Sequence, residues 1–231
     1  MKQLFSTLLL IIALSVSAQQ AYNVRAPFDP ATVKMEEHLR GEVLRFTIND
    51  SKIYPGTERE ILVYVPRQYK SNKPACLLLC MDGILYDATT VMDNLIASGE
   101  MPVTVGVFVN PGVVYDDNRE VVRYNRCKEF DSTDDTFATF LETEVLPRVE
   151  GMKTQTGKTI ALSHNPNDRA ITGASSGGIA AFTAAWNRPV TSGSAVKVRS
   201  SAGMVEGMVT SQPAKLKPAF SGSAGLVISV P

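Results

Sequence analysis

The sequence predicts an α/β fold in which a mostly parallel central sheet is flanked by helices. Two continuous apolar runs, residues 75–81 and 103–109, are typical of strands that are buried on both faces. Segments with strand character alternate with segments of helical periodicity, as expected when helices connect parallel strands. A glycine-rich turn also joins a short strand at residues 169–173 to a helix of small residues at 177–186. These observations favour a single α/β domain.

Each further element rests on a local pattern. Residues 41–49 have strand character, with Val43, Phe46 and Ile48 apolar, and residues 60–65 alternate in part and are rich in β-branched and aromatic side chains, which predicts strands. Helical periodicity predicts helices over residues 91–98, where Gly99 stops the helix, and 137–149. Asp134 and Asp135 precede the second of these helices and are expected to cap its start. Residues 110–136 are expected to be a long polar loop beyond a buried strand, where active-site loops of such sheets lie.

Length and composition exclude several classes of protein. The chain has 231 residues, of which 44% are hydrophobic, and 23 basic residues balance 23 acidic ones. A disordered chain would be less hydrophobic, and a nucleic-acid-binding protein would usually carry a basic excess. No His, Cys or carboxylate spacing fits a metal site, so we expect neither a metal nor a cofactor. The oligomeric state does not follow from the sequence.

The N-terminus has the pattern of a secretory signal peptide, residues 1–18. Lys2 supplies the positive charge, residues 8–14 form a short apolar stretch, and Val16 and Ala18 are small residues at a cleavage site. We therefore expect the chain to be secreted or periplasmic. The alternative is an uncleaved N-terminal anchor. No later segment is long and apolar enough to span a membrane.

Three cysteines are too few for a disulfide scaffold. Cys76 and Cys80 lie on one predicted strand, about 13 Å apart at the usual rise, which is too far for a disulfide. With Cys127 the number of cysteines is odd, so we interpret all three as free thiols. We expect the thiols of Cys76 and Cys80 to be buried in their strand.

The turn at residues 173–177 (GASSG) fits the pattern G-x-S-x-G with a strand before it and a helix after it. This context predicts that Ser175 is a nucleophile on a sharp turn and that the amide of Ser176 faces a developing oxyanion. A second oxyanion donor is expected in the loop after residues 75–81, where Asp82 and Gly83 lie. The alternatives are a plain glycine-rich turn and an Asp82 that only ends its strand.

Further stretches make the pattern specific, and together they resemble the esterase family of the α/β-hydrolase superfamily, especially its enterochelin-esterase-like members. The resemblance covers residues 51–189 and rests on residues 51–59 (SKIYPGTER), 63–66 (VYVP), 81–83 (MDG), 93–96 (DNLI), 99–102 (GEMP), 125–126 (NR), 129–131 (EFD), 167–171 (NDRAI), 173–178 (GASSGG) and 186–189 (WNRP).

The resemblance implies an α/β-hydrolase fold and a Ser-His-Asp esterase that works through an acyl-enzyme. The implied substrates are siderophore lactones or carbohydrate-linked esters such as feruloyl and acetyl groups. By position, Ser175 is the implied nucleophile, and the amides of Ser176 and Gly83 are the implied oxyanion hole. Asp82, Arg126 and Glu129 are implied to border the substrate. Arg126 and Glu129 could instead form a solvated ion pair.

The sequence departs from that pattern after Pro189. No histidine and no aspartate follow, and Glu206 is the only acid there. A serine nucleophile needs a base, and in this fold the acid and the histidine follow the serine. His38 and His164 precede it. His164 is expected at the opposite end of the sheet and His38 on the surface, so neither is expected to act as the base.

We therefore divide the chain into a signal peptide (1–18), a polar N-terminal segment with the first strand (19–50), an esterase domain (51–189) and a divergent tail (190–231). The tail is interpreted as translated out of frame, and a diverged but genuine C-terminus is the alternative. Two functions stay open. The first is an exported serine esterase with reduced activity. The second is a module that binds an ester or a glycan without cleaving it, and a fragment without function is the remaining possibility.

Overall fold

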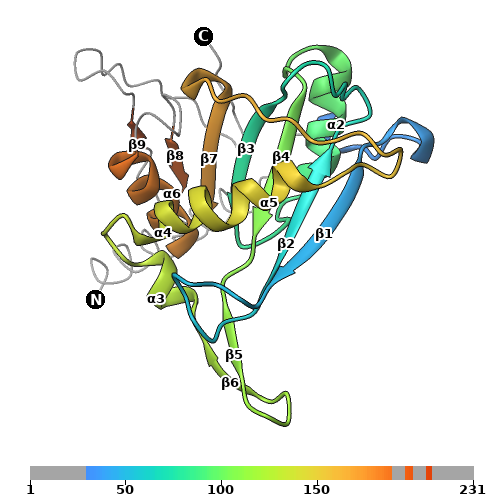
Figure 1. The fold of residues 1–231 in the computed structure, drawn as a ribbon. Helices are drawn as coiled ribbons and strands as arrows, with labels where there is room; N and C mark the ends of the chain where they lie inside the picture. Colours follow the sequence, from blue (N-terminus) through green and yellow to red (C-terminus); the bar gives the residue numbers. More distant parts are fainter. Residues whose placement is uncertain (1–29, 189–195, 200–206, 210–231) are drawn as a thin grey trace, which may run out of the picture. The chain divides into compact units, whose positions relative to one another are not determined.

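A seven-stranded sheet organises the structure, which is a computed structural model describing residues 30–188, 196–199 and 207–209 (Figure 1). All of these residues except Pro30 belong to one compact unit, Ala31–Pro218. The strand order is β1-β2-β4-β3-β7-β8-β9. The strands are β1 (Glu42–Ile48), β2 (Arg59–Val65), β3 (Cys76–Met81), β4 (Thr104–Val109), β7 (Arg169–Ala174), β8 (Val196–Arg199) and β9 (Gly207–Val209).

The middle of the sheet is parallel and its edges are antiparallel. Strands β4, β3, β7 and β8 run in the same direction. β1 and β2 form an antiparallel pair, β2 joins β4 antiparallel, and β9 joins β8 in the same way. The predicted α/β class with a mostly parallel centre is confirmed. The predicted strands also occur within one or two residues of their expected bounds.

The two buried strands are apolar throughout because both of their faces are covered. One face of the sheet belongs to the main hydrophobic core, to which the odd-numbered residues contribute: Leu77, Leu79 and Met81 of β3 and Val105, Val107 and Val109 of β4. The other face packs under α2 (Ala88–Ser98), whose Met92 lies over Gly106. The hydroxyl of Tyr64 on β2 donates to Asp93 of α2 at 2.7 Å.

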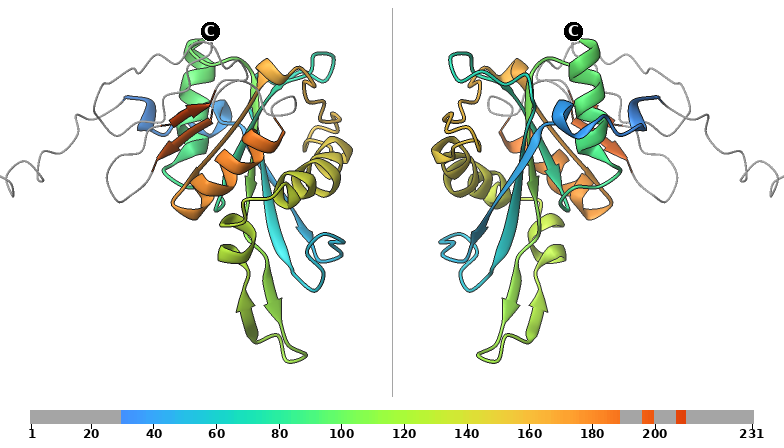
Figure 2. Two further views of the ribbon diagram at one scale, coloured as in Figure 1. Left: turned by 90° about the vertical axis from the view of Figure 1, so that its left-hand side faces the viewer. Right: turned by 90° about the vertical axis from the view of Figure 1, so that its right-hand side faces the viewer.

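The remaining helices cover the main-core face (Figure 2). α4 (Thr136–Phe140), a π-helical turn (Leu141–Val145) and α5 (Leu146–Gly151) form one helical segment, and α6 (Ser176–Asn187) lies beside it. The sequence predicted a single helix over 137–149. The π turn interrupts it just before Pro147, which has no N–H to continue the regular hydrogen-bond ladder. Asp134 Oδ1 accepts from the amide of Thr136 at 2.9 Å and so bonds the start of α4 as expected, whereas Asp135, the N-cap residue, makes no capping hydrogen bond with its side chain.

The prediction that residues 110–136 form one long polar loop is wrong. They form a hairpin of β5 (Val113–Tyr115) and β6 (Val121–Tyr124), followed by α3 (Arg126–Phe130). The hairpin projects beyond the sheet (Figure 2). Asp116 organises its tip by accepting from the amides of Asn118 and Glu120, each at 2.9 Å. Strands of three and four residues are too short for alternation to show in the sequence.

Short 3-10 turns complete the described fold, at Pro30–Thr32, Glu37–Leu39 and Pro166–Asp168. The expected signal peptide, residues 1–18, lies outside the described residues, as does most of the tail after Pro189. Two tail segments are described, and the first, β8, lies parallel to β7. Among the helices that the structure describes, none has the length and apolar character needed to cross a membrane.

Candidate active site

Ser175 lies at the junction of β7 and α6 with a strained backbone. Its φ is 54° and its ψ is −128°, a conformation that residues with a side chain rarely adopt. The residue is exposed. The glycines on either side permit the turn, because a Cβ on Gly173 would collide with the backbone of Gly177, and a Cβ on Gly177 would lie 2.7 Å from Asp82 Oδ2. The local geometry therefore matches the sharp strand-to-helix turn that the sequence predicted around Ser175.

Backbone amides surround this turn. Ser176 and Gly177 are the first residues of α6, and the first amides of a helix have no acceptor within the helix. The carbonyl of Ser175 accepts from Gly178 and Ile179, at 2.9 and 3.2 Å, which starts the helix immediately after the serine. The amide of Ser176 is therefore available at the positive end of the helix dipole, where an oxyanion would be stabilised.

The loop after β3 lies beside the serine because β3 and β7 are adjacent and parallel, with Cys80 paired to Thr172. Asp82 and Gly83 both have left-handed backbones, with φ of 68° and 74°. A Cβ on Gly83 would lie 2.6 Å from Asn110 Oδ1, and the positive φ would strain any side chain there, so the position favours glycine. The topology thus brings the two predicted oxyanion donors, Ser176 and Gly83, to the same edge of the sheet.

Asp82 is held by Arg126 in a two-bond ion pair. The Nε and Nη2 atoms of Arg126 donate to the two carboxylate oxygens at 2.6 and 2.8 Å, and Nη2 also approaches the carbonyl of Ala174 at 3.4 Å. Hydrogen bonding to Asp82 raises the pKa of Arg126. The pair is partly exposed, with side-chain exposures of 15% for Asp82 and 33% for Arg126. Arg126 therefore ties α3 to both strand ends of the site.

Glu129 is placed differently from Arg126, and the two do not form the solvated pair considered from the sequence. Its side chain is fully buried and accepts from both terminal nitrogens of Arg59, at 2.5 and 2.9 Å. It also accepts from the amide of Gly112 and the side chain of Asn125, both at 3.2 Å. Glu129 thus anchors α3 to β2 from below, and no atom of its side chain faces solvent.

Both histidines of the chain lie in the described part, and both lie away from Ser175. His164 precedes the start of β7, at the end of that strand opposite the serine, and its Nε2 lies 3.2 Å from Glu150. His38 lies in the Glu37–Leu39 turn, 3.4 Å from Glu36. Their side chains are 76% and 68% exposed. Neither histidine is positioned to take a proton from Ser175.

The loop between β3 and α2 carries a feature that the sequence did not reveal. Besides Asp82 and Gly83, Tyr86 and Asp87 have left-handed backbones, with φ of 53° and 50°. Tyr86 is 82% exposed and Leu85 is 38% exposed. Strained backbones of this kind concentrate at functional sites. An apolar, exposed surface thus directly follows the loop of Asp82 and Gly83, and no motif in the sequence marks it.

The three cysteines are free thiols. Cys76 and Cys80 lie on β3, and burial raises the pKa of Cys80 to about 12. Cys127 on α3 is exposed. Over the residues that the structure describes, no three His, Cys or acidic side chains converge in a way that could hold a metal ion.

The sheet order and the strand-serine-helix turn define the α/β-hydrolase class of fold. A family model described as Putative esterase matches residues 52–206, more than half of the chain, and extends past Pro189. The chain belongs to this esterase family. No curated protein matches the chain.

Solved structures with the same fold include three esterases. Enterochelin esterase from Shigella flexneri is 17% identical, with a TM-score of 0.55. Ferric enterobactin esterase from Salmonella typhimurium is 19% identical, with a TM-score of 0.55. A ferulic acid esterase from Anaeromyces mucronatus is 18% identical, with a TM-score of 0.56. The alignments cover 77%, 77% and 74% of this chain, and 40%, 40% and 62% of those proteins. The chain thus spans less than half the length of the enterobactin esterases.

Proposed function

We propose that this chain is an exported serine carboxylic-ester hydrolase of reduced activity, with Ser175 as its nucleophile. The observation that carries the proposal is the strained backbone of Ser175 between β7 and α6. A serine held in this way exposes its hydroxyl next to the first amides of the helix. The substrate class is a siderophore-type or carbohydrate-linked ester, by analogy with what the similar enterobactin and ferulic acid esterases act on.

The reaction proceeds in two stages. Ser175 Oγ forms a bond to the ester carbonyl carbon, and the amides of Ser176 and Gly83 bind the resulting oxyanion. The bond to the alcohol oxygen then breaks, the alcohol takes up a proton, and an acyl-serine remains. Water attacks this acyl group, releases the carboxylic acid and restores Ser175.

The proton of Ser175 needs an acceptor. Because both histidines lie elsewhere and no histidine or aspartate follows Pro189, the acceptor is solvent water. Loss of a triad base lowers the rate by orders of magnitude and leaves the contributions of binding and of the oxyanion hole. We therefore expect slow turnover, best seen with activated esters.

A fluorophosphonate probe and p-nitrophenyl acetate test the proposal on the purified chain. We expect covalent labelling and slow turnover, both of which disappear in Ser175→Ala. His164→Ala is the matched control, and it should leave both unchanged because His164 lies at the other end of β7. Labelling that survives Ser175→Ala, or that disappears in His164→Ala, would contradict the proposed roles.

The second candidate is a module that binds an ester or a glycan without cleaving it. The positions of the two histidines favour it, because they leave Ser175 without a histidine base. A sample that melts cooperatively but shows neither labelling nor turnover would support this module. A sample without a cooperative melt would instead indicate a fragment without function.

Export and the tail have separate tests. Mass spectrometry of the chain from the periplasm or the medium should find Gln19 as its first residue, since we propose that residues 1–18 are removed. For the tail we propose a change of reading frame after Pro189. The coding DNA should then encode an aspartate and a histidine in another frame, and their absence from both other frames would refute this idea.

A further inference from the structure

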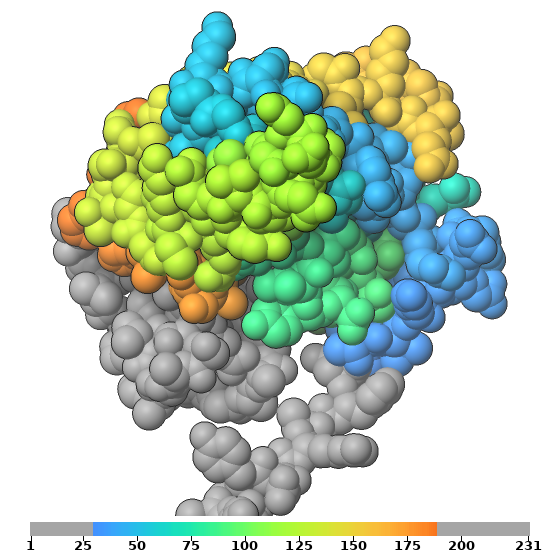
Figure 3. Space-filling model, turned by 90° about the horizontal axis from the view of Figure 1, so that it is seen from below, coloured from blue at the N-terminus to red at the C-terminus, as the bar shows by residue number. Residues whose placement is uncertain are grey.

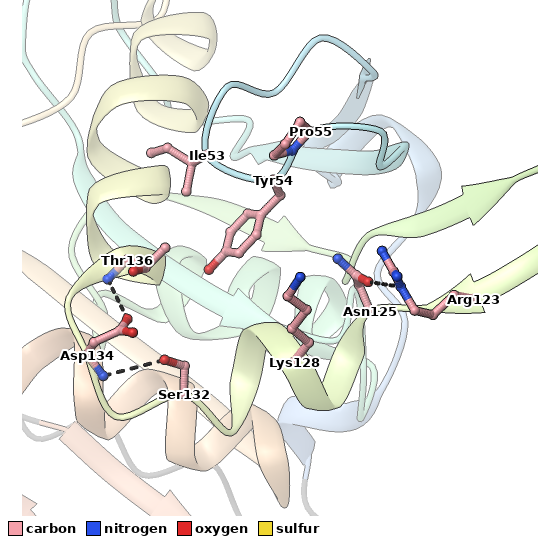
Figure 4. Close-up of a pocket in the computed structure, with 9 residues that line it drawn as sticks. All are labelled: Ile53, Tyr54, Pro55, Arg123, Asn125, Lys128, Ser132, Asp134 and Thr136. Atoms are coloured by element: carbon pink, nitrogen blue, oxygen red, sulfur yellow. Dashed lines mark hydrogen bonds between the residues drawn. The ribbon is translucent and has the colours of Figure 1, made fainter.

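A cavity lies on the side of α3 away from Ser175. It has a volume of about 280 Å³, near the lower end of the range for small-molecule pockets. Figure 4 shows its walls: the loop between β1 and β2 on one side, and β6, α3 and the start of α4 on the other. The lining residues are Ile53, Tyr54, Pro55, Arg123, Asn125, Lys128, Ser132, Asp134 and Thr136.

Tyr54 supplies the strongest sign that the cavity takes a ligand. The residue is only 7% exposed, yet its hydroxyl has no hydrogen-bond partner. A buried polar group without a partner is costly and needs an explanation. The ring is fixed edge-on against Phe140, with centroids 5.4 Å apart, and the guanidinium of Arg59 lies 5.1 Å from it. Figure 4 shows the hydroxyl pointing into the cavity.

The cavity has an apolar side and a cationic side. Ile53, Pro55 and the Tyr54 ring lie on the first side. Lys128 points into the cavity from α3 and forms no ion pair with any described residue.

The other charged groups of the lining are engaged. Arg123 adds a second positive charge while its Nε donates to Asn125 at 2.8 Å. The carboxylate of Asp134 is the one acidic group of the lining, and it caps the amide of Thr136. Lys128 is therefore the cation left to meet a ligand.

Burial raises the pKa of the Tyr54 hydroxyl, so this group stays protonated and can donate a hydrogen bond. A donor at the buried end of the cavity and an ammonium group beside it suit an oxygen anion. The apolar wall suits a hydrocarbon body. These features differ from those of the site at Ser175, which uses backbone amides.

We propose that this cavity binds a small organic carboxylate, with its anionic group between Lys128 and Tyr54 and its apolar body against Ile53 and Pro55. The site is distinct from the nucleophile turn. Arg126 and Lys128 stand two positions apart on α3 and so point to opposite sides of it, Arg126 toward Asp82 and Lys128 into the cavity. The inference does not depend on ester cleavage at Ser175.

Isothermal titration of the purified full chain with benzoate, benzamide and inorganic phosphate tests the proposal. Benzoate should bind at one saturable site. Benzamide, which has the same ring without the charge, should bind about tenfold more weakly, because a charge-assisted hydrogen bond is lost. Phosphate, which lacks the apolar body, should also bind more weakly than benzoate.

Two variants locate the binding. Lys128→Met should weaken benzoate binding about tenfold. Its control is Lys70→Met, which removes an exposed lysine from the turn after β2, at the other end of the sheet, and should change nothing. Tyr54→Phe should weaken binding about threefold without lowering the melting temperature, because the hydroxyl has no partner in the free protein.

Several results would overturn the proposal. They are the absence of saturable benzoate binding, equal binding of benzoate and benzamide, and phosphate binding as tight as that of benzoate. An equal loss in Lys128→Met and Lys70→Met would show a general charge effect instead of a site. A clear fall in the melting temperature of Tyr54→Phe would show that the hydroxyl already has a partner.

Discussion

Substitution of Glu129 by glutamine should destabilise the fold more than any change to an exposed ion pair. Glu129 and Arg59 have fully buried side chains, and two hydrogen bonds of 2.5 and 2.9 Å join them. Arg59 also donates to Thr57 at 2.9 Å. Glutamine keeps the shape of the side chain but removes its charge, so a guanidinium is left buried without a counter-ion.

The size of the effect follows from this geometry. Breaking one side of a buried pair costs about 3–5 kcal/mol. The ring of Phe140 lies 4.4 Å from the guanidinium of Arg59 and offsets part of the loss, so we expect about 3 kcal/mol. A domain of this size loses about 2–4 °C of melting temperature per kcal/mol, which gives a fall of about 6–12 °C. Such a loss is a large share of the stability of an ordinary domain.

Thermal melting followed by circular dichroism at neutral pH measures this fall. Asp50→Asn is the control, because Asp50 pairs with Arg148 at 2.7 Å in the open, where its side chain is 66% exposed. We expect almost no change from the control. The double variant Arg59→Met with Glu129→Leu should recover much of the stability, since no buried charge remains. Equal melting temperatures for Glu129→Gln and Asp50→Asn would refute the reasoning.

Two further predictions concern the nucleophile turn and the thiols. Ser175→Gly should be more stable than Ser175→Ala by about 1 kcal/mol in urea unfolding, because glycine relieves a backbone strain of about 1–3 kcal/mol at a smaller entropic cost. Equal stabilities would show that the turn is unstrained. At pH 8, iodoacetamide should alkylate exposed Cys127 and spare Cys80. Cys80 is buried, and its pKa near 12 keeps the thiol protonated and therefore unreactive. Rapid loss of both thiols at equal rates would contradict this burial.

Much of the fold could be predicted because its signals are local. Continuous apolar runs marked β3 and β4, since strands covered on both faces need apolar residues throughout. The position of Ser175 followed from a strand, a glycine-rich turn and a helix in direct succession. Gly83 was predicted to lie near Ser175, because each of these residues follows a parallel strand at the same edge of the sheet.

Other features could not be predicted because they depend on distant partners. The carboxylate of Glu129 has Arg59, seventy positions earlier, as its partner, and nothing local distinguishes it from a surface acid. Asp93 likewise accepts from the hydroxyl of Tyr64 and from the amide of Gly41, and these bonds depend on the long-range packing of α2 against the sheet. The antiparallel pairing of β1 with β2 and the short β5–β6 hairpin likewise arise from tertiary contacts.

The network around α3 explains how the turn at Ser175 and the cavity at Tyr54 can share one support. Seen from below in Figure 3, residues of the hairpin and α3, in yellow-green, lie against the blue and cyan surface of the loop between β1 and β2. Glu129 fixes α3 from the buried side, Arg126 extends from it to Asp82 beside the turn at Ser175, and Lys128 extends into the cavity at Tyr54.

Loss of the Glu129 anchor should therefore disturb both sites together. Loss of the Arg126 pair should disturb only the turn at Ser175, because that pair does not reach the cavity at Tyr54. Ser175, the amides of Ser176 and Gly83, and the cavity at Tyr54 are all formed by residues before Pro189. The strained turn at Ser175 therefore does not require a base from the residues after Pro189 to hold its shape.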